Sequence, residues 1–128
     1  PARARAKVAG WLRKDPNLDM VLGFVGTGAI GAAQAFKESG AKPSSVYVAG
    51  IDGQAQALQM MLKDGPRGPY KASYASPLAG PIQVSTAYGM VNGTGPSTVV
   101  LGYTPLRASN PAGIRRWINT QYKPWGIG

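Results

Sequence analysis

Short apolar runs alternate with amphipathic segments along this chain, and this alternation constrains its fold more than any other feature. Residues 20–25 and 46–51 are apolar runs without alternation, as expected for strands buried on both faces of a parallel sheet. Two further strands are predicted over 70–76 and 98–103. Helices are predicted over residues 2–14, 29–39, 54–63, 79–91 and 111–122. The order predicts an α/β fold, with a layered, mostly parallel sheet flanked by helices.

The first predicted helix has one apolar face, formed by Ala4, Val8, Trp11 and Leu12. We interpret this face as packed against the core, with Trp11 part of that core. Trp117 and Trp125 near the end of the chain could stack on a ligand, but the pattern does not place them.

The composition excludes several classes of chemistry. The 128 residues include no His and no Cys, which rules out disulfides, Cys-His zinc sites, thiol nucleophiles and imidazole-based triads within this chain. Only 5 carboxylates are present, far apart in sequence, so a hydrolase with paired carboxylates is a poor candidate. These absences exclude much of catalytic chemistry within this chain, and we expect no metal site and no cofactor.

The chain is strongly basic, with 14 Lys and Arg and a formal charge of +9. These charges cluster at the start and near the end, without the interleaved aromatic residues that single-strand binders use. We interpret them as a solvated face and predict no nucleic-acid partner. No apolar run is long enough to span a membrane, and the start at Pro1 suggests a piece of a longer protein.

The sharpest local motif is a G-x-G-x-x-G over residues 26–31, after a predicted strand and at the start of a helix. Asp52 ends the next strand, in the place of the acidic residue that holds the ribose of a dinucleotide. This pattern supports an alternative function, a Rossmann-type nicotinamide-dependent oxidoreductase fragment. Against it, a helix precedes this strand, whereas the fingerprint normally belongs to the first βαβ unit. Small residues in a first helical turn also allow tight packing in any such unit.

Several segments in order carry a resemblance to a known family. They are 11–21 (WLRKDPNLDMV), 31–40 (GAAQAFKESG), 46–53 (VYVAGIDG), 63–65 (KDG), 72–73 (AS) and 79–80 (AG). Most of residues 4–104 resembles the later half of the type I periplasmic solute-binding proteins of sugar ABC transporters, the ribose-binding type. DNA-binding repressors share this fold, but no helix-turn-helix is present here.

The resemblance implies two α/β lobes that close on a small polar ligand, with only the C-terminal portion in this chain. Residues 1–76 would form part of the second lobe, 77–104 would cross to the first lobe, and 105–128 would return. Asp52 would accept hydrogen bonds from ligand hydroxyls, and it also fits a helix N-cap before Gln54. Thr27 and Ser76 are candidate ligand contacts, although family members carry an Asn-Asp pair and a Gln near these places.

The resemblance also implies a function and partners. The function is non-catalytic capture of a small polar ligand, a carbohydrate, for an ABC permease. The location of the whole protein would be periplasmic or extracellular, in association with a membrane. Without the first lobe, the apolar face of residues 79–91 would fold back on this sheet, pair with another copy by domain swapping, or stay exposed. Of these, we expect self-association as a homodimer through this helix. A structural or sensory domain that keeps the fold without transport is a third possibility.

Overall fold

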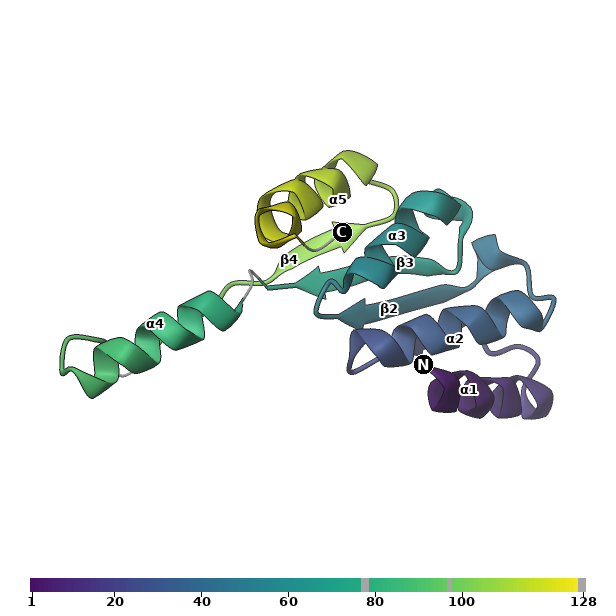
Figure 1. Cartoon of the computed structure of the whole chain (residues 1–128). Coiled ribbons are helices and arrows are strands. Elements are labelled where there is room, and N and C mark those ends of the chain that lie inside the picture. The colour runs from purple at the N-terminus through teal and green to yellow at the C-terminus, as the bar shows by residue number, and fades with distance from the viewer. Residues whose placement is uncertain (77–78, 97, 127–128) are drawn as a thin grey trace.

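The computed structural model describes residues 1–76, 79–96 and 98–126. A four-stranded sheet, ordered β1-β2-β3-β4, forms its centre (Figure 1). Strands β1 (Met20–Leu22), β2 (Tyr47–Ile51) and β3 (Tyr70–Ala75) are parallel to one another, whereas β4 (Thr104–Arg107) is antiparallel to β3. The predicted α/β class with a mostly parallel sheet is confirmed.

Five α-helices are described: α1 (Ala2–Lys14), α2 (Gly26–Glu38), α3 (Ala55–Asp64), α4 (Ala79–Val91) and α5 (Pro111–Trp117). A π-helical turn (Ile118–Tyr122) and a 3₁₀ turn (Lys123–Trp125) extend α5. The Asn110 side chain caps α5 by accepting the Gly113 N–H at 3.0 Å, and Pro111 fits the first helical position. Short 3₁₀ turns also lie at Pro43–Ser45 and Gly65–Arg67.

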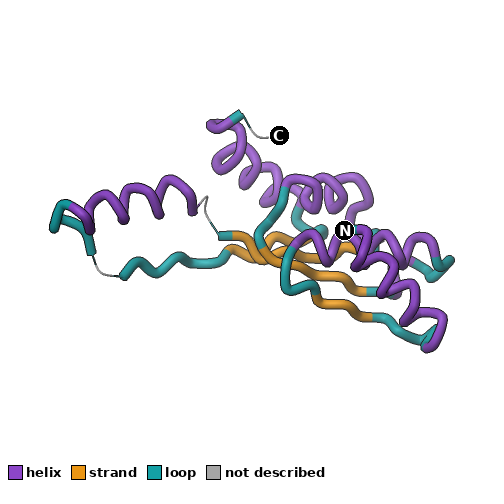
Figure 2. The backbone as a smooth tube through the Cα atoms, turned by 60° about the horizontal axis from the view of Figure 1, so that its bottom comes forward, coloured by secondary structure: helices purple, strands orange, loops and turns teal. Residues whose placement is uncertain are grey.

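Helices α2, α3 and α5 cover one face of the sheet, and α1 packs on α2 (Figure 2). The core lies between these helices and the sheet, where Phe36, Val48 and Leu58 have no exposed surface. Residues on the other face are open to solvent: Leu22 is 69% exposed, and Tyr74 is 51% exposed. The prediction that the first two strands are buried on both faces is wrong for β1, where Met20 and Leu22 are exposed, whereas three consecutive residues of β2, Val48–Gly50, are buried.

The fourth strand does not lie at residues 98–103, where the sequence predicts it. The strand that pairs with β3 is Thr104–Arg107, and residues 98–103 lead into it as an extended segment without a ladder of their own. Its Pro105 is tolerated because β4 is an edge strand, where a missing N–H costs no ladder bond. Leu106 points into the core and is 4% exposed.

Helix α4 and the extended segment after it form an arm that projects from the body of the molecule (Figures 1 and 2). In the described structure this helix has no extensive contact with the sheet or with another helix. Val84, Tyr88 and Val91 are 70%, 73% and 87% exposed. A helix that is apolar on several sides is normally buried. The arm therefore exposes an apolar surface that nothing in the described structure covers.

The tryptophans fall into three situations. Trp11 was predicted in the core but is 45% exposed, since α1 contacts α2 through the neighbouring stripe of Ala4, Val8 and Leu12. The Lys7 ammonium lies 6.0 Å from the centre of its ring. Trp117 is buried in the core, and the side chain of Trp125 lies outside the described part of the structure.

Candidate functional site

The three predicted site residues lie at one edge of the sheet, where the parallel strands end. Asp52 follows β2 directly, Ser76 follows β3, and Thr27 lies in the first turn of α2 after β1. The N–H of Asp52 donates to the carbonyl of Tyr74 at 2.8 Å, which ties the end of β2 to the end of β3. Asp52 and Thr27 are exposed, and Ser76 is half-buried. This edge is where ligands of open parallel sheets bind.

Asp52 has an unusual backbone conformation, with φ of +82°. It is the one non-glycine residue with positive φ in the described chain. An L-residue in this region carries a conformational cost of about 1–2 kcal/mol, and Asp is among the residues that tolerate it best. Such strain is found mostly where a side chain must be aimed at a particular place. The alternative reading of Asp52 as a helix cap is wrong, because the N-cap of α3 is Gln54 and no side chain caps it.

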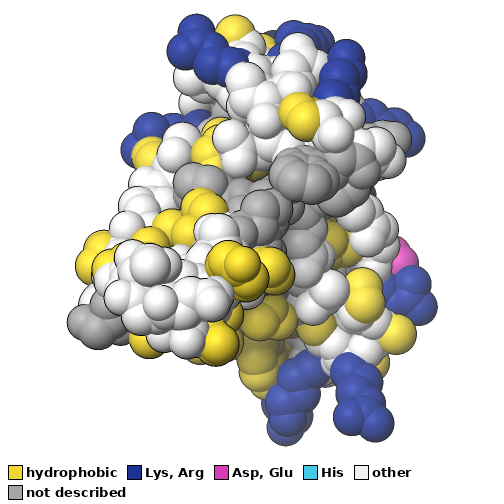
Figure 3. Space-filling model, turned by 60° about the vertical axis from the view of Figure 1, so that its left-hand side comes forward, with side chains coloured by type: hydrophobic (Ala, Val, Ile, Leu, Met, Phe, Trp, Pro, Cys, Tyr) yellow, Lys and Arg dark blue, Asp and Glu magenta, His cyan; other side chains and the backbone are white. Residues whose placement is uncertain are grey.

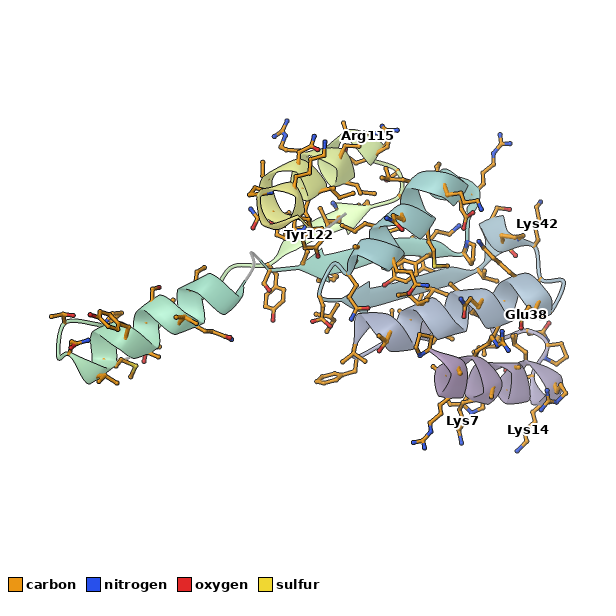
Figure 4. All side chains as sticks on the ribbon, viewed as in Figure 1. Lys7, Lys14, Glu38, Lys42, Arg115 and Tyr122 are labelled. Atoms are coloured by element: carbon orange, nitrogen blue, oxygen red, sulfur yellow. The ribbon has the colours of Figure 1, made fainter. Side chains whose placement is uncertain are left out.

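Gly53 is held from both sides by buried hydroxyl groups. Its N–H donates to Ser73 Oγ at 3.1 Å, and its carbonyl oxygen accepts a hydrogen bond from the Tyr122 hydroxyl. Ser73 has no exposed surface, and Tyr122 is 7% exposed. Figure 4 shows Tyr122 reaching from the C-terminal segment toward the sheet, whereas Lys7 and Lys14 point away from the body. A residue from the last turn of the chain thus contacts the turn that follows β2.

Two buried phenols beneath this turn have shifted acidities. Burial raises the pKa of Tyr70 to about 12; the hydroxyl of Ser73 opposes the rise, and the charge of Asp52 adds to it. Burial also raises the pKa of Tyr122, with the Trp117 indole opposing and the Asp52 charge adding. Both phenols therefore stay protonated at neutral pH, and the hydroxyl of Tyr122 remains a donor to Gly53.

An apolar groove of about 350 Å³ lies on the open face of the sheet, beside the strand ends. Its lining residues are Leu22, Gly23, Phe24, Ala49, Gly50, Ile51 and Tyr74. None of the three predicted polar residues lines it. The sequence reasoning missed Phe24, which lies two residues after the end of β1 and is 89% exposed. An aromatic residue at a strand end was a signal that could have identified it, because aromatic rings pack well against sugar faces.

The glycines of the G-x-G-x-x-G motif have packing roles. Helix α2 begins at Gly26, earlier than the predicted residue 29, so the motif forms its first turns. A Cβ built on Gly26 would lie 2.8 Å from the Ile51 carbonyl oxygen, and one on Gly31 would lie 2.3 Å from the Pro1 carbonyl oxygen. Gly28 has room for a Cβ, with Val25 Cγ2 at 3.9 Å. Close approach of α2 to β2 and α1 accounts for two of the three glycines.

Solved structures with the same fold include sugar- and solute-binding proteins. One is a galactofuranose binding protein, with a TM-score of 0.72 and 20% identity over 94% of this chain. A second is an ABC transporter solute binding protein from Agrobacterium vitis with bound allitol, with a TM-score of 0.76 and 22% identity over 89% of this chain. The chain has the fold of a type I periplasmic-binding-protein lobe.

A third protein with this binding-protein fold, from Bacillus halodurans with bound myo-inositol, has a TM-score of 0.76 and 22% identity over 91% of this chain. The chain spans 42%, 40% and 38% of the lengths of these three proteins. No family model matches the sequence, and no curated protein matches it in sequence. The similarity therefore lies in the fold.

The described residues contain no group of three or more carboxylates that could hold a metal ion. Among the same residues, no helix has both the length and the apolar character needed to cross a bilayer.

Proposed function

We propose that this chain forms part of the second lobe of a solute-binding protein that captures a sugar or polyol for an ABC permease. The observation that carries the proposal is the fold that nearly the whole chain shares with such proteins. Asp52 follows β2, at the carboxyl ends of the parallel strands, where ligands of open α/β sheets bind. The proteins with this fold include ones with bound allitol, myo-inositol and 5-methylthioribose. All three are small and rich in hydroxyl groups.

The chemistry of the edge fits a polyhydroxylated ligand. The Asp52 carboxylate would accept charge-assisted hydrogen bonds from two hydroxyls at once. Thr27 and Ser76 would add neutral hydroxyl partners, and the exposed ring of Phe24 would pack against the apolar face of a sugar. No covalent step is needed, so the protein would act as a receptor and not as an enzyme. The whole protein would work in the periplasm or outside the cell.

The arm would belong to the other lobe. Residues 72–106 include no charged side chain, although the chain carries a charge of +9. Figure 3, which looks at the arm, shows Lys and Arg gathered above and below it. We propose that residues 77–104 cross to the first lobe and pack there. Residues 1–76 and 105–128 would stay in the second lobe. The face of the sheet that no helix covers would lie against further parts of the whole protein.

A titration of the isolated chain with myo-inositol, allitol, tagatose, glucose and galactose tests the ligand class. Half of the cleft is absent, so we expect weak binding, with a dissociation constant in the millimolar range. Binding should appear as chemical shift changes of the amides of Thr27, Asp52 and Ser76. Asp52→Asn should abolish these changes. Asp19→Asn is the matched control, because this exposed carboxylate precedes β1, at the amino ends of the parallel strands and opposite the candidate site. Equal shifts in both variants would reject Asp52 as the ligand group.

A titration with NADH and NADPH, followed by energy transfer from the tryptophans, tests the oxidoreductase alternative. A complete glycine loop needs no second lobe to hold a dinucleotide. Saturable micromolar binding that is lost in Gly28→Val would overturn the proposal. We expect no binding.

The isolated chain is proposed to form a homodimer through α4, because the exposed side chains of Val84, Tyr88 and Val91 lack another partner surface in the described structure. Light scattering above micromolar concentration should give a dimeric mass. Val84→Lys with Val91→Lys should return the mass to that of a monomer. A monomeric mass for the unaltered chain would contradict this association.

A further inference from the structure

The turn after β2 carries the candidate ligand carboxylate, yet little holds that carboxylate directly. Asp52 is exposed and makes one described backbone hydrogen bond, from its N–H to the Tyr74 carbonyl at 2.8 Å. Its positive φ is a conformation that an L-residue leaves readily when its surroundings allow. A binding group is most effective when its geometry is fixed before the ligand arrives. Something else must therefore hold this turn.

The residue after it is fixed on both sides. The N–H of Gly53 belongs to the peptide that joins it to Asp52, and this N–H donates to Ser73 Oγ at 3.1 Å. The carbonyl of Gly53 belongs to the peptide that joins it to Gln54, and it accepts from the Tyr122 hydroxyl. Each bond prevents rotation of one peptide plane. Together they define the backbone on the C-terminal side of Asp52.

The residues packed around Gly53 leave no room for a side chain at this position. A Cβ built on this glycine would lie 2.5 Å from Ala75 Cβ, and its φ of +60° is one that L-residues avoid. The same Cβ would lie 3.7 Å from Trp117 Nε1. Trp117 is the last residue of α5, and Tyr122 is the last residue of the π-helical turn that extends it, so this C-terminal segment packs against the turn.

We propose that Ser73 and Tyr122 are positioning residues that hold the Asp52 carboxylate in its ligand-binding orientation through the two peptide groups of Gly53. This inference rests on the proposed function for the role of Asp52. It assigns to the C-terminal segment an indirect part in ligand binding, through the turn that carries Asp52. The phenol acts through a backbone carbonyl and does not contact the ligand.

Amide hydrogen exchange of the full chain, followed by NMR without ligand, tests the positioning role first. Tyr122→Phe removes one hydroxyl and keeps the ring, so the fold should be retained. We expect exchange of the Gly53 and Gln54 amides to rise about tenfold, the effect of losing one hydrogen bond, while the amide of Val48 in the middle of β2 changes far less. Tyr103→Phe, at a tyrosine that is 61% exposed, is the matched control and should change neither.

The sugar titration then tests whether the turn matters for binding. With the sugar that gives the largest shifts in the unaltered chain, the dissociation constant should rise about threefold or more in Tyr122→Phe and in Ser73→Ala. Unchanged exchange at Gly53, an equal rise at all β2 amides, or unchanged sugar affinity would each overturn the positioning role. Failure of the proposed function shows separately, as an absence of any sugar-induced shift in the unaltered chain.

Discussion

Gly31 of α2 lies so close to Pro1 of α1 that a Cβ on the glycine would be 2.3 Å from the proline carbonyl oxygen. The same Cβ would lie 2.9 Å from the backbone nitrogen of Arg5. The two helices are also joined by an ion pair between Arg5 Nη1 and Glu38 Oε1 at 3.2 Å. This glycine therefore fixes how closely the first helix can approach the second.

Gly31→Ala should destabilise the protein by about 1–2 kcal/mol, because α1 must move away from α2 to admit the methyl group. Gly28→Ala is the matched control in the same helix. Its Cβ has room, so the higher helix propensity of Ala should stabilise the protein by roughly 0.5–1 kcal/mol. Urea unfolding measures both changes. The same sign in both variants would contradict the packing role of Gly31.

Asp52→Gly should make the fold more stable while it removes the ligand group. Gly adopts the positive φ at this position without the side-chain penalty, which should add about 1 kcal/mol of stability. Asp52→Asn should leave stability nearly unchanged, because Asn also tolerates this conformation. Thermal unfolding gives the comparison. A drop in Tm for Asp52→Gly would show that the carboxylate stabilises the turn instead of straining it.

Gly53→Ala should destabilise the fold by at least about 2 kcal/mol, through both the left-handed backbone and the contact with Ala75. Gly40→Ala separates the two causes. Gly40 also has a positive φ, of +76°, but no atom lies within 4 Å of its built Cβ. Chemical denaturation of both variants should give the larger loss for Gly53→Ala. Equal losses would mean that the Ala75 contact has no cost.

Stability should fall in alkaline solution as the buried phenols lose their protons. The pKa of Tyr70 is about 12 in the folded state and about 10 in an unfolded chain, so the folded state binds its proton more tightly. The stabilisation is complete below pH 10 and is lost as the pH rises to 12, on the order of 3 kcal/mol in total. The raised pKa of Tyr122 acts in the same direction.

Tyr70→Phe should flatten this alkaline loss of stability, measured by urea unfolding between pH 9 and pH 12. Tyr103→Phe, at an exposed tyrosine, should leave the loss unchanged. Parallel curves for the unaltered protein and Tyr70→Phe would disprove the role of this phenol. The difference between Tyr70→Phe and Tyr103→Phe isolates the contribution of the buried phenol.

Local patterns predicted most of the elements. The helices over 2–14 and 79–91 match to the residue, because their periodicity and their boundaries agree. Helix α2 begins earlier than predicted, because Gly26 packs against β2 and residues 26–28 form the first helical turn instead of a separate loop. Strand β4 was misplaced, because the apolar run 98–103 reads as a strand although residues 104–107 make the ladder. An apolar run alone does not show which segment will pair with the edge of the sheet.

The strand-end rule predicted the location of Asp52, Thr27 and Ser76 at one edge. It did not predict the partners of Gly53. Tyr122 is 69 residues away in sequence, and only the return of the chain through β4 and α5 brings it to the turn. The sequence also did not reveal that one face of the sheet is uncovered, because a strand with an open face has the same apolar run as one that is covered on both sides.

The return of the chain also sets the order in which the molecule can assemble. Strand β4 cannot join β3 until residues 76–103 have been bridged, and the entropic cost of closing a long loop makes such pairing slow. Tyr122 reaches Gly53 only after that step. During synthesis, a nascent chain that ends before residue 122 would contain Asp52 and its strand but lack the hydroxyl that holds the turn. The candidate binding group is therefore expected to acquire its final geometry among the last events of folding.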